Sequence, residues 1–149
     1  MLSSTIALAG DHAGFDYKEA LKAVLIEKGY SVKDFGPNAS DSVDYPDYIH
    51  PMAQAMEEGD FKLGIIVCGS GNGVAITANK YPHIRAALCW LPELASLARQ
   101  HNDANVLALP ARFIELEAAK NILDHFLAAD FEGGRHARRV AKIADGLNF

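Results

Sequence analysis

A cysteine followed by a glycine-rich turn is the part of this sequence best suited to chemistry. Residues 63–67 form an apolar run, Cys68 follows it, and glycines occupy positions 69, 71 and 73. An unbroken apolar run is typical of a central parallel strand that helices cover on both faces. The glycines let successive backbone N–H groups converge, and the positive N-terminal end of the next helix adds to them. The segment therefore predicts an anion-binding loop directly after a buried strand.

The same field favours the thiolate form of Cys68, which makes this residue a candidate base or nucleophile. The local residues leave a second interpretation open, a buried cysteine before a tight turn. A basic cluster near the C-terminus has two interpretations as well, a solvated helix face or a seat for a small anion. Its members are Arg135, His136, Arg138, Arg139 and Lys142.

Length and composition predict one domain, 1–149, with a full hydrophobic core. Two cysteines are too few for a disulfide framework, and no apolar stretch approaches the roughly 20 residues of a membrane span. The N-terminus has no basic segment followed by an apolar one. The formal net charge of −5 argues against nucleic acid as the main partner. We therefore expect a cytoplasmic, reduced protein that binds neither nucleic acid nor membrane.

Short apolar runs alternate with helical periodicities along the chain. We expect strands at 6–9, 31–35, 63–67, 85–89 and 106–109. We expect helices at 17–28, 47–58, from the glycine loop to about 80, at 92–100, 114–128 and 134–145. This alternation predicts an α/β fold with a five-stranded parallel sheet, right-handed crossovers, helices on both faces and an extra C-terminal helix.

Polar residues follow several of the expected strands directly. Asp11 and His12 end the first strand, residues 68–73 follow the third, and Arg112 lies just beyond the fifth. In open parallel sheets ligands bind at the carboxyl ends of the strands, where the topology reverses. We therefore expect these residues to share one cleft.

His101 is different, because it follows a helix and precedes the fifth strand. It belongs at the opposite edge of the sheet, so a second subunit must supply it if it works with Cys68. The local alternative is that His101 and Asn102 only cap the end of the helix.

Three established uses of such a loop do not fit. A cysteine phosphatase needs arginine six positions after the nucleophile, where this chain has Val74, and a thioredoxin-like site needs a second cysteine at Gly71. A dinucleotide loop reads G-x-G-x-x-G after the first strand, whereas this loop is G-x-G-x-G after the third, and the P-loop lysine is missing. Proton abstraction next to a carbonyl remains, with a thiolate base, N–H groups for the enediolate oxygen and Ser70 to relay protons.

Seven ordered motifs resemble those of the type B ribose-5-phosphate isomerases, a family that also contains the allose-6-phosphate and galactose-6-phosphate isomerases. The resemblance covers nearly the whole chain. The motifs are G-D-H-A-G-F at 10–15, D-Y-P at 44–46, C-G-S-G-N-G at 68–73, A-N-K at 78–80, I-R-A-A at 84–87, R-Q-H-N-D-A-N-V at 99–106 and E-G-G-R-H-A-R-R at 132–139.

The resemblance implies a single-domain, Rossmann-like three-layer sandwich that is a metal-free aldose–ketose isomerase without cofactors. It implies a homodimer or a dimer of dimers with the active site at the subunit interface, acting on a phosphorylated aldose or ketose sugar. The expected reaction interconverts ribose 5-phosphate and ribulose 5-phosphate through an enediolate, in the pentose phosphate pathway. The alternatives are an allose-6-phosphate or galactose-6-phosphate isomerase, or a sugar-phosphate-binding module that has lost catalysis.

The motifs also assign roles by resemblance. Cys68 resembles the base that moves the proton between C1 and C2, Ser70 its assistant, and His101 the residue that opens the sugar ring. The amides from Gly69 to Gly73 resemble the anion hole, with Gly71 and Asn72 between them. Residues expected on the sugar hydroxyls are Asp11, Tyr45 and Asn102. Residues expected on the phosphate are His12, Arg112, Arg135 and Arg139, the last two an i, i+4 pair on one helix face with Val140, Ile143 and Leu147 packed nearby.

Alternatives remain for several of these residues. Family members without the cysteine carry glutamate directly after the loop, and here that residue is Val74. The cysteine version therefore applies, although Ser70 and Asn72 resemble the other branch. Asp11 can be a helix cap and Tyr45 a core aromatic. Cys89 is expected in the core, and Trp90 and Leu91 either line the sugar pocket or pack.

Overall fold

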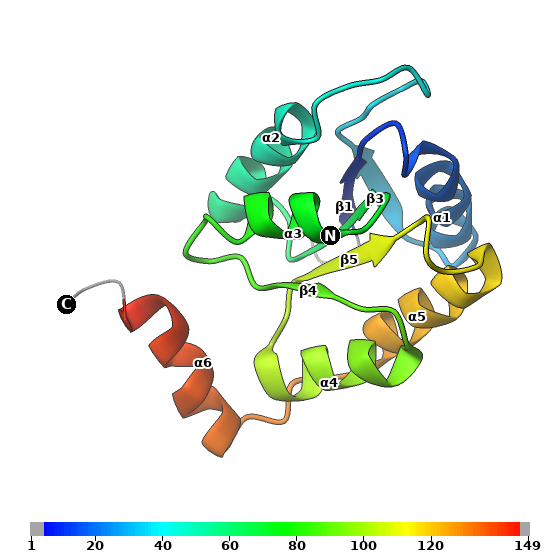
Figure 1. Cartoon of the computed structure of the whole chain (residues 1–149). Helices are drawn as coiled ribbons and strands as arrows, with labels where there is room; N and C mark the ends of the chain where they lie inside the picture. Colours follow the sequence, from blue (N-terminus) through cyan, green and yellow to red (C-terminus); the bar gives the residue numbers. More distant parts are fainter. Residues whose placement is uncertain (1–4, 147–149) are drawn as a thin grey trace.

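The computed structural model describes residues 5–146, which form five strands and six helices (Figure 1). The strands are β1 (Thr5–Gly10), β2 (Ser31–Asp34), β3 (Leu63–Cys68), β4 (Ala86–Leu88) and β5 (Val106–Pro110). The helices are α1 (Phe15–Glu27), α2 (Pro46–Glu57), α3 (Asn72–Ala78), α4 (Pro92–Asn102), α5 (Leu116–Ala128) and α6 (Arg135–Asp145). Each corresponds to an element expected from the apolar patterns.

The sheet is parallel throughout, with strand order β2-β1-β3-β5-β4. The chain steps from β1 outward to β2, then returns to β3 and continues to the opposite side. The topology therefore reverses between β1 and β3, whose central register pairs Leu8 with Ile65. This switch point is where parallel α/β sheets bind ligands.

Helices cover both faces of the sheet, which makes three layers. One core contains Ile65 and Val67 of β3 with apolar residues of α1, α4 and α5. The other contains Ile66 and Cys68 with residues of α2 and α3. Successive strand residues point to opposite faces, so β3 supplies both cores. The expected Rossmann-like three-layer sandwich is confirmed.

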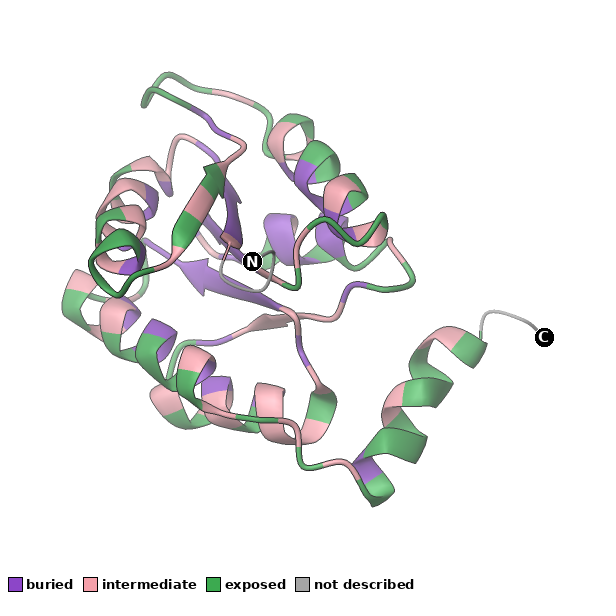
Figure 2. Cartoon of the chain, turned by 180° about the vertical axis from the view of Figure 1, so that it is seen from behind, coloured by how far each residue is buried: buried purple, intermediate pink, exposed green. Residues whose placement is uncertain are grey.

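Helix α6 stands apart from these layers and lies nearest to α4 (Figure 1). Most of its surface is exposed (Figure 2), and His136 is its buried residue. Val140 is half-buried and Ile143 is 57% exposed, so neither belongs to the core of this chain, although both lie in the same groove as Arg139. Leu147 lies outside the described residues. Across residues 5–146, every helix is too short or too polar to traverse a lipid bilayer.

Most of the expected boundaries were wrong by one or two residues, and those of β4 and α4 bear on the site. Strand β4 is shorter than expected and excludes Cys89, although Cys89 is buried, its N–H donates to the Ala108 carbonyl, and burial raises its pKa to about 11. Helix α4 continues to Asn102 and stops where Asp103 adopts a left-handed φ of 47°. Trp90 is 54% exposed, so it does not pack within this chain.

An ion pair ties β2 to α1 beneath the switch point. Lys18 is fully buried, and its Nζ lies 2.7 Å from Oδ2 of Asp34. Lys22 lies 3.2 Å from the same oxygen, and the Gly36 N–H donates to Oδ1. Burial by itself raises the pKa of Asp34, but the hydrogen bonds from Lys18, Gly36 and Lys22 and the Lys18 charge outweigh it and lower the pKa. Asp34 is therefore held as a carboxylate.

Asp34→Asn should lower the free energy of unfolding by about 3 kcal/mol at pH 7, because it leaves the buried Lys18 with only the more distant Glu19 carboxylate, 3.5 Å away. The folded pKa of Asp34 lies below its ordinary value of 3.8, so this contribution is complete above that pH and disappears as the pH falls through the folded value. Urea unfolding from pH 7 to 3 should give a difference between wild type and variant that shrinks only below about pH 4.

Lys22→Ala is the matched control, because Lys22 is more exposed and the Lys18–Asp34 pair survives. It should cost less than about 1 kcal/mol. Equal losses in the two variants would contradict the importance of the buried pair.

Candidate active site

The carboxyl ends of β1, β3 and β5 enclose a cleft of about 390 Å³ at the switch point. Because parallel strands end at the same edge, polar residues far apart in the sequence meet here. The lining residues are Asp11, His12, Ala13, Tyr45, Cys68, Gly69, Ser70, Gly73, Arg112 and Phe113. The expectation that the strand ends share one cleft is confirmed.

Cys68 is nearly buried, and a backbone N–H is directed at its sulfur. The Gly71 N–H donates to Sγ over 3.1 Å. Gly71 adopts a φ of 76°, and a Cβ there would lie 2.4 Å from Cδ1 of Leu88, so the turn requires glycine. Helix α3 is only seven residues long, which makes this local N–H the direct support for negative charge on the sulfur.

The loop amides are only partly free for a ligand. Besides the Gly71 N–H, the Asn72 N–H is engaged, since it donates to Oγ of Ser70 over 3.3 Å. The Asn72 side chain is exposed and is not among the lining residues of the cleft. Two of the amides expected in an anion hole thus orient Cys68 and Ser70 in this structure.

Asp11 and His12 are both fixed by backbone groups. Oδ1 of Asp11 accepts the Gly14 N–H over 3.0 Å, so Asp11 closes the turn before α1 and also lines the cleft. Nδ1 of His12 accepts the Val43 N–H over 3.1 Å. A neutral His12 therefore carries its proton on Nε2, a donor suited to an anion.

Tyr45 and Arg112 close over the glycine loop. A Cβ at Gly73 would lie 2.5 Å from Cζ of Tyr45, and one at Gly69 would lie 3.1 Å from Cδ of Arg112. The Arg112 N–H also donates to the Gly69 carbonyl over 3.0 Å. Tyr45 is 37% exposed at the cleft, so the alternative of a core aromatic is wrong.

The remaining expected site residues lie elsewhere. His101, Asn102 and Arg139 line a groove of about 670 Å³ between α4, β4 and α6, and Arg135 is exposed at the start of α6. His101 is in the last turn of α4, before β5, so it lies at the amino edge of the sheet as expected. One chain therefore does not bring His101 to Cys68.

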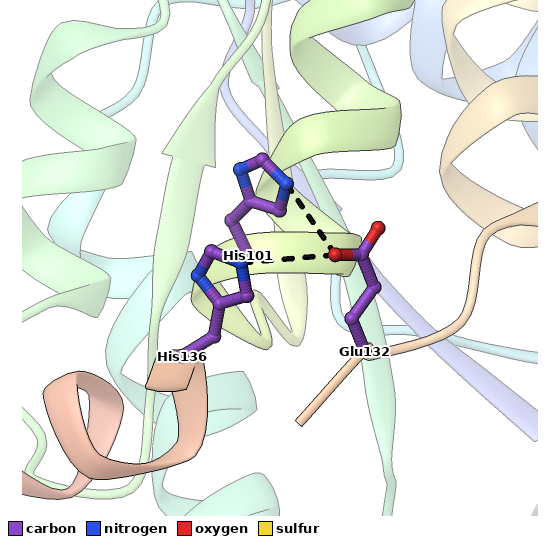
Figure 3. A group of neighbouring side chains, drawn as sticks. All are labelled: His101, Glu132 and His136. Carbon is purple, nitrogen blue, oxygen red and sulfur yellow. Dashed lines mark ion pairs between the residues drawn. The ribbon is translucent and has the colours of Figure 1, made fainter. Parts of the chain in front are cut away.

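His101 does more than cap its helix. Its ring stacks on that of His136, with centroids 4.2 Å apart and planes 8° apart, and its Nε2 lies 3.7 Å from Glu132 (Figure 3). Burial, His101 and Arg135 lower the pKa of His136, while Glu132 acts in the opposite direction.

Sequence reasoning did not assign a site role to Phe113, Ala13 or Glu132, and it placed His136 only in the basic cluster that could seat a small anion. Phe113 and Ala13 line the cleft because each follows a residue already placed there, and proximity in sequence to Arg112 and His12 was the available signal. Glu132 and His136 belong to the E-G-G-R-H-A-R-R motif, but only the fold of α6 onto α4 brings them to His101.

A third hollow of about 590 Å³ lies at the amino edge of the sheet. Its charged groups contact one another, with Glu57 accepting from His83 and Asp103 paired to Arg85 and Arg99. Because these charged groups bind one another, none of them is directed at a ligand. The switch-point cleft is therefore the candidate active site.

The fold and the cleft define a class, the parallel α/β proteins that bind a small ligand at a switch point beside a reactive side chain. Comparison with known proteins then identifies the family. Residues 6–143 match the family described as Ribose/Galactose Isomerase, and the chain belongs to this family.

Several relatives cover nearly the whole chain. Ribose-5-phosphate isomerase B of Escherichia coli K12 is 47% identical over 138 residues, 93% of each chain. The structure of the Clostridium thermocellum ribose-5-phosphate isomerase B has a TM-score of 0.94 at 44% identity, covering 97% of each chain. That of the Mycoplasma genitalium enzyme, with bound ribulose 5-phosphate, has a TM-score of 0.92 at 42% identity and covers 97% of this chain and 96% of its own.

Gly73→Ala should reveal the contact between Tyr45 and the loop. Alanine is favoured over glycine in a helix by about 1 kcal/mol, but its Cβ would lie 2.5 Å from Cζ of Tyr45. We expect Gly73→Ala to destabilise the wild type by about 1–3 kcal/mol and to stabilise the Tyr45→Ala variant. Urea unfolding of the double-mutant cycle measures both effects. The same effect of Gly73→Ala in both backgrounds would contradict the contact.

Proposed function

We propose that this chain is an aldose–ketose isomerase that interconverts ribose 5-phosphate and ribulose 5-phosphate through an enediolate, with Cys68 as the base. The hydrogen bond from the Gly71 N–H to the Cys68 sulfur, inside the switch-point cleft, carries this proposal. Membership of the Ribose/Galactose Isomerase family and similarity to ribose-5-phosphate isomerase B of Escherichia coli support it.

The chemistry uses only protein groups. The Cys68 thiolate takes the proton from C2 of the open-chain aldose, and the C2–H electron pair forms the enediolate double bond while negative charge moves to the C1 oxygen. The thiol then returns the proton to C1, and the C2 hydroxyl loses its proton to become the ketone. Ser70 relays protons between the two oxygens. These proton transfers need neither a metal nor an organic cofactor. The interconversion of the two pentose phosphates is a step of the pentose phosphate pathway.

The sugar phosphate is positioned by the residues around the cleft. Asp11 and Tyr45 bind sugar hydroxyls, and His12 and Arg112 donate hydrogen bonds to the phosphate. All four residues line the same cleft as Cys68. The amides of Gly69 and Gly73, with Ser70, stabilise the developing oxyanion, while the N–H groups of Gly71 and Asn72 hold Cys68 and Ser70 in place.

A second subunit completes the site. His101 opens the sugar ring, Asn102 binds a hydroxyl, and Arg135 and Arg139 bind the phosphate, but these residues lie around another groove of the same chain. A two-fold dimer presents the α4–α6 groove of one protomer to the cleft of the other and makes two equivalent sites. The exposed face of α6 supports such a homodimer, alone or within a dimer of dimers (Figure 2).

Six-carbon sugar phosphates are the second candidate substrates, because the family description also names galactose isomerases. Discrimination by one missing contact in a pocket amounts to only about 1–3 kcal/mol. Allose 6-phosphate and galactose 6-phosphate therefore belong in the same assay as ribose 5-phosphate, and no turnover of any of them would favour a sugar-phosphate-binding module.

Cys68→Ala should abolish most ribose 5-phosphate turnover while substrate still binds, because the base is removed and the phosphate contacts remain. The assay follows ketose formation and exchange of the substrate C2 proton into solvent, and calorimetry measures binding. Cys68→Ser should also be nearly inactive, since a hydroxyl is far harder to ionise than a thiol.

Cys89→Ala is the matched control, because this cysteine is buried away from the cleft. It should keep near wild-type activity at temperatures where it is folded. Proton exchange that survives Cys68→Ala would exclude Cys68 as the base and leave the rest of the site to be reassigned.

Mixing inactive Cys68→Ala with inactive His101→Ala chains tests the shared site. In a mixed dimer one site carries both defects and the other neither, so random pairing should restore activity toward one quarter of wild type. Subunit exchange is followed independently by mass spectrometry. Absence of recovery despite complete exchange would place both residues' actions within one chain.

A further inference from the structure

A second cluster of chemically capable side chains lies outside the cleft, where α4 and α6 meet. His101 ends α4, Glu132 lies in the connection between α5 and α6, and His136 is in the first turn of α6 (Figure 3). One donor atom from each residue lies within 4.8 Å of the others. Among residues 5–146, these three form the one histidine, cysteine and carboxylate group with such spacing.

One buried nitrogen atom of this cluster, Nε2 of His136, has no hydrogen-bond partner among the described residues. It lies 3.7 Å from Oε1 of Glu132, and Nε2 of His101 lies 3.7 Å from the same oxygen, both too far for a hydrogen bond. Because the two rings are nearly parallel, both nitrogens face the carboxylate from neighbouring positions (Figure 3).

Two imidazole nitrogens and one carboxylate oxygen are a donor set that Zn²⁺ takes in proteins with an open fourth position. Bonds of about 2.0–2.1 Å in a tetrahedron place neighbouring donors about 3.3–3.4 Å apart. The two nitrogen–oxygen separations of 3.7 Å need to contract by only a few tenths of an ångström. The two ring nitrogens lie within 4.8 Å of each other on stacked rings, so one imidazole must also turn for both in-plane lone pairs to meet at one ion. His101 and His136 line the α4–α6 groove, and Glu132 and His101 are partly exposed, so an ion and a water ligand have access.

The surrounding charges oppose a cation only in part. Arg135 and Arg139 lie on the same helix as His136, and Glu132 offsets one of them. Arginine side chains are always protonated and do not compete as ligands. Binding of a metal ion therefore depends on direct coordination by the two imidazoles rather than on the net charge around the site.

We propose that His101, Glu132 and His136 bind a divalent transition-metal ion, for which Zn²⁺ is the probe, and that the bound ion inhibits the isomerase by occupying His101. Inhibition rests on the proposed function, because it requires His101 to open the sugar ring. The binding site rests on the geometry alone. The ion is an inhibitor and takes no part in the reaction.

Calorimetry of the chelator-treated full chain with Zn²⁺ tests the site. One ion should bind per chain, and Glu132→Gln and His136→Gln should each weaken binding at least about tenfold. His125→Gln is the matched control, because His125 lies on α5 and its Nδ1 donates to the Asn121 carbonyl of its own helix over 2.9 Å. Cys68→Ala controls for binding at the thiol of the cleft. Both controls should keep wild-type affinity.

The isomerase assay with added Zn²⁺ tests the consequence. Each protein is compared with its own metal-free activity, and the inhibition constant of the wild type should equal the calorimetric dissociation constant and rise at least about tenfold in Glu132→Gln. Zn²⁺ affinity lost in Cys68→Ala but kept in His136→Gln would overturn the site. Tight binding without inhibition of an active enzyme would overturn the inhibitory role. A chain without metal-free isomerase activity would instead contradict the proposed function, and calorimetry would still decide the site.

Discussion

The close approach of the β1–α1 loop to the end of β3 is the constraint on which the site depends. The Asp11 N–H donates to the Val67 carbonyl over 3.2 Å, and a Cβ on Gly14 would lie 2.3 Å from that oxygen. Gly10 approaches the same carbonyl, since its Cβ would lie 2.6 Å away. Two side chains are therefore absent where the strands meet. This contact holds Asp11 and His12 beside Cys68, which directly follows Val67.

The sequence predicted the fold and the cleft well because both depend on local patterns. Apolar runs mark the strands, and Cys68 and Arg112 follow them directly, so their common edge is fixed once the sheet is parallel. The cluster of Glu132 with His101 was not predictable in this way. It depends on where α6 lies against α4, and the connection from 129 to 134 has no periodicity that fixes its path.

The division of the expected site residues between two hollows follows from the directions of the elements. Strand β3 delivers Cys68 at its carboxyl end, whereas α4 runs back across the sheet and delivers His101 at the amino end. Arg139 of α6 lines the same groove as His101, and most of the surface of α6 is exposed (Figure 2). In the proposed dimer, the same surface that joins the protomers would also supply the ring-opening and phosphate-binding groups, so association and activity would be selected together.

The two cysteines have different surroundings. Cys89 is almost fully enclosed, and its pKa of about 11 leaves it as a neutral thiol, which peroxides attack poorly. Cys68 borders an open cleft, and the Gly71 N–H supports negative charge on its sulfur. Oxidation of Cys68 to a sulfenic acid would remove the proposed base, and a thiol reductant would restore it. If Cys68 is the base, the cleft and the N–H contact that would serve proton transfer would also leave its sulfur open to oxidants.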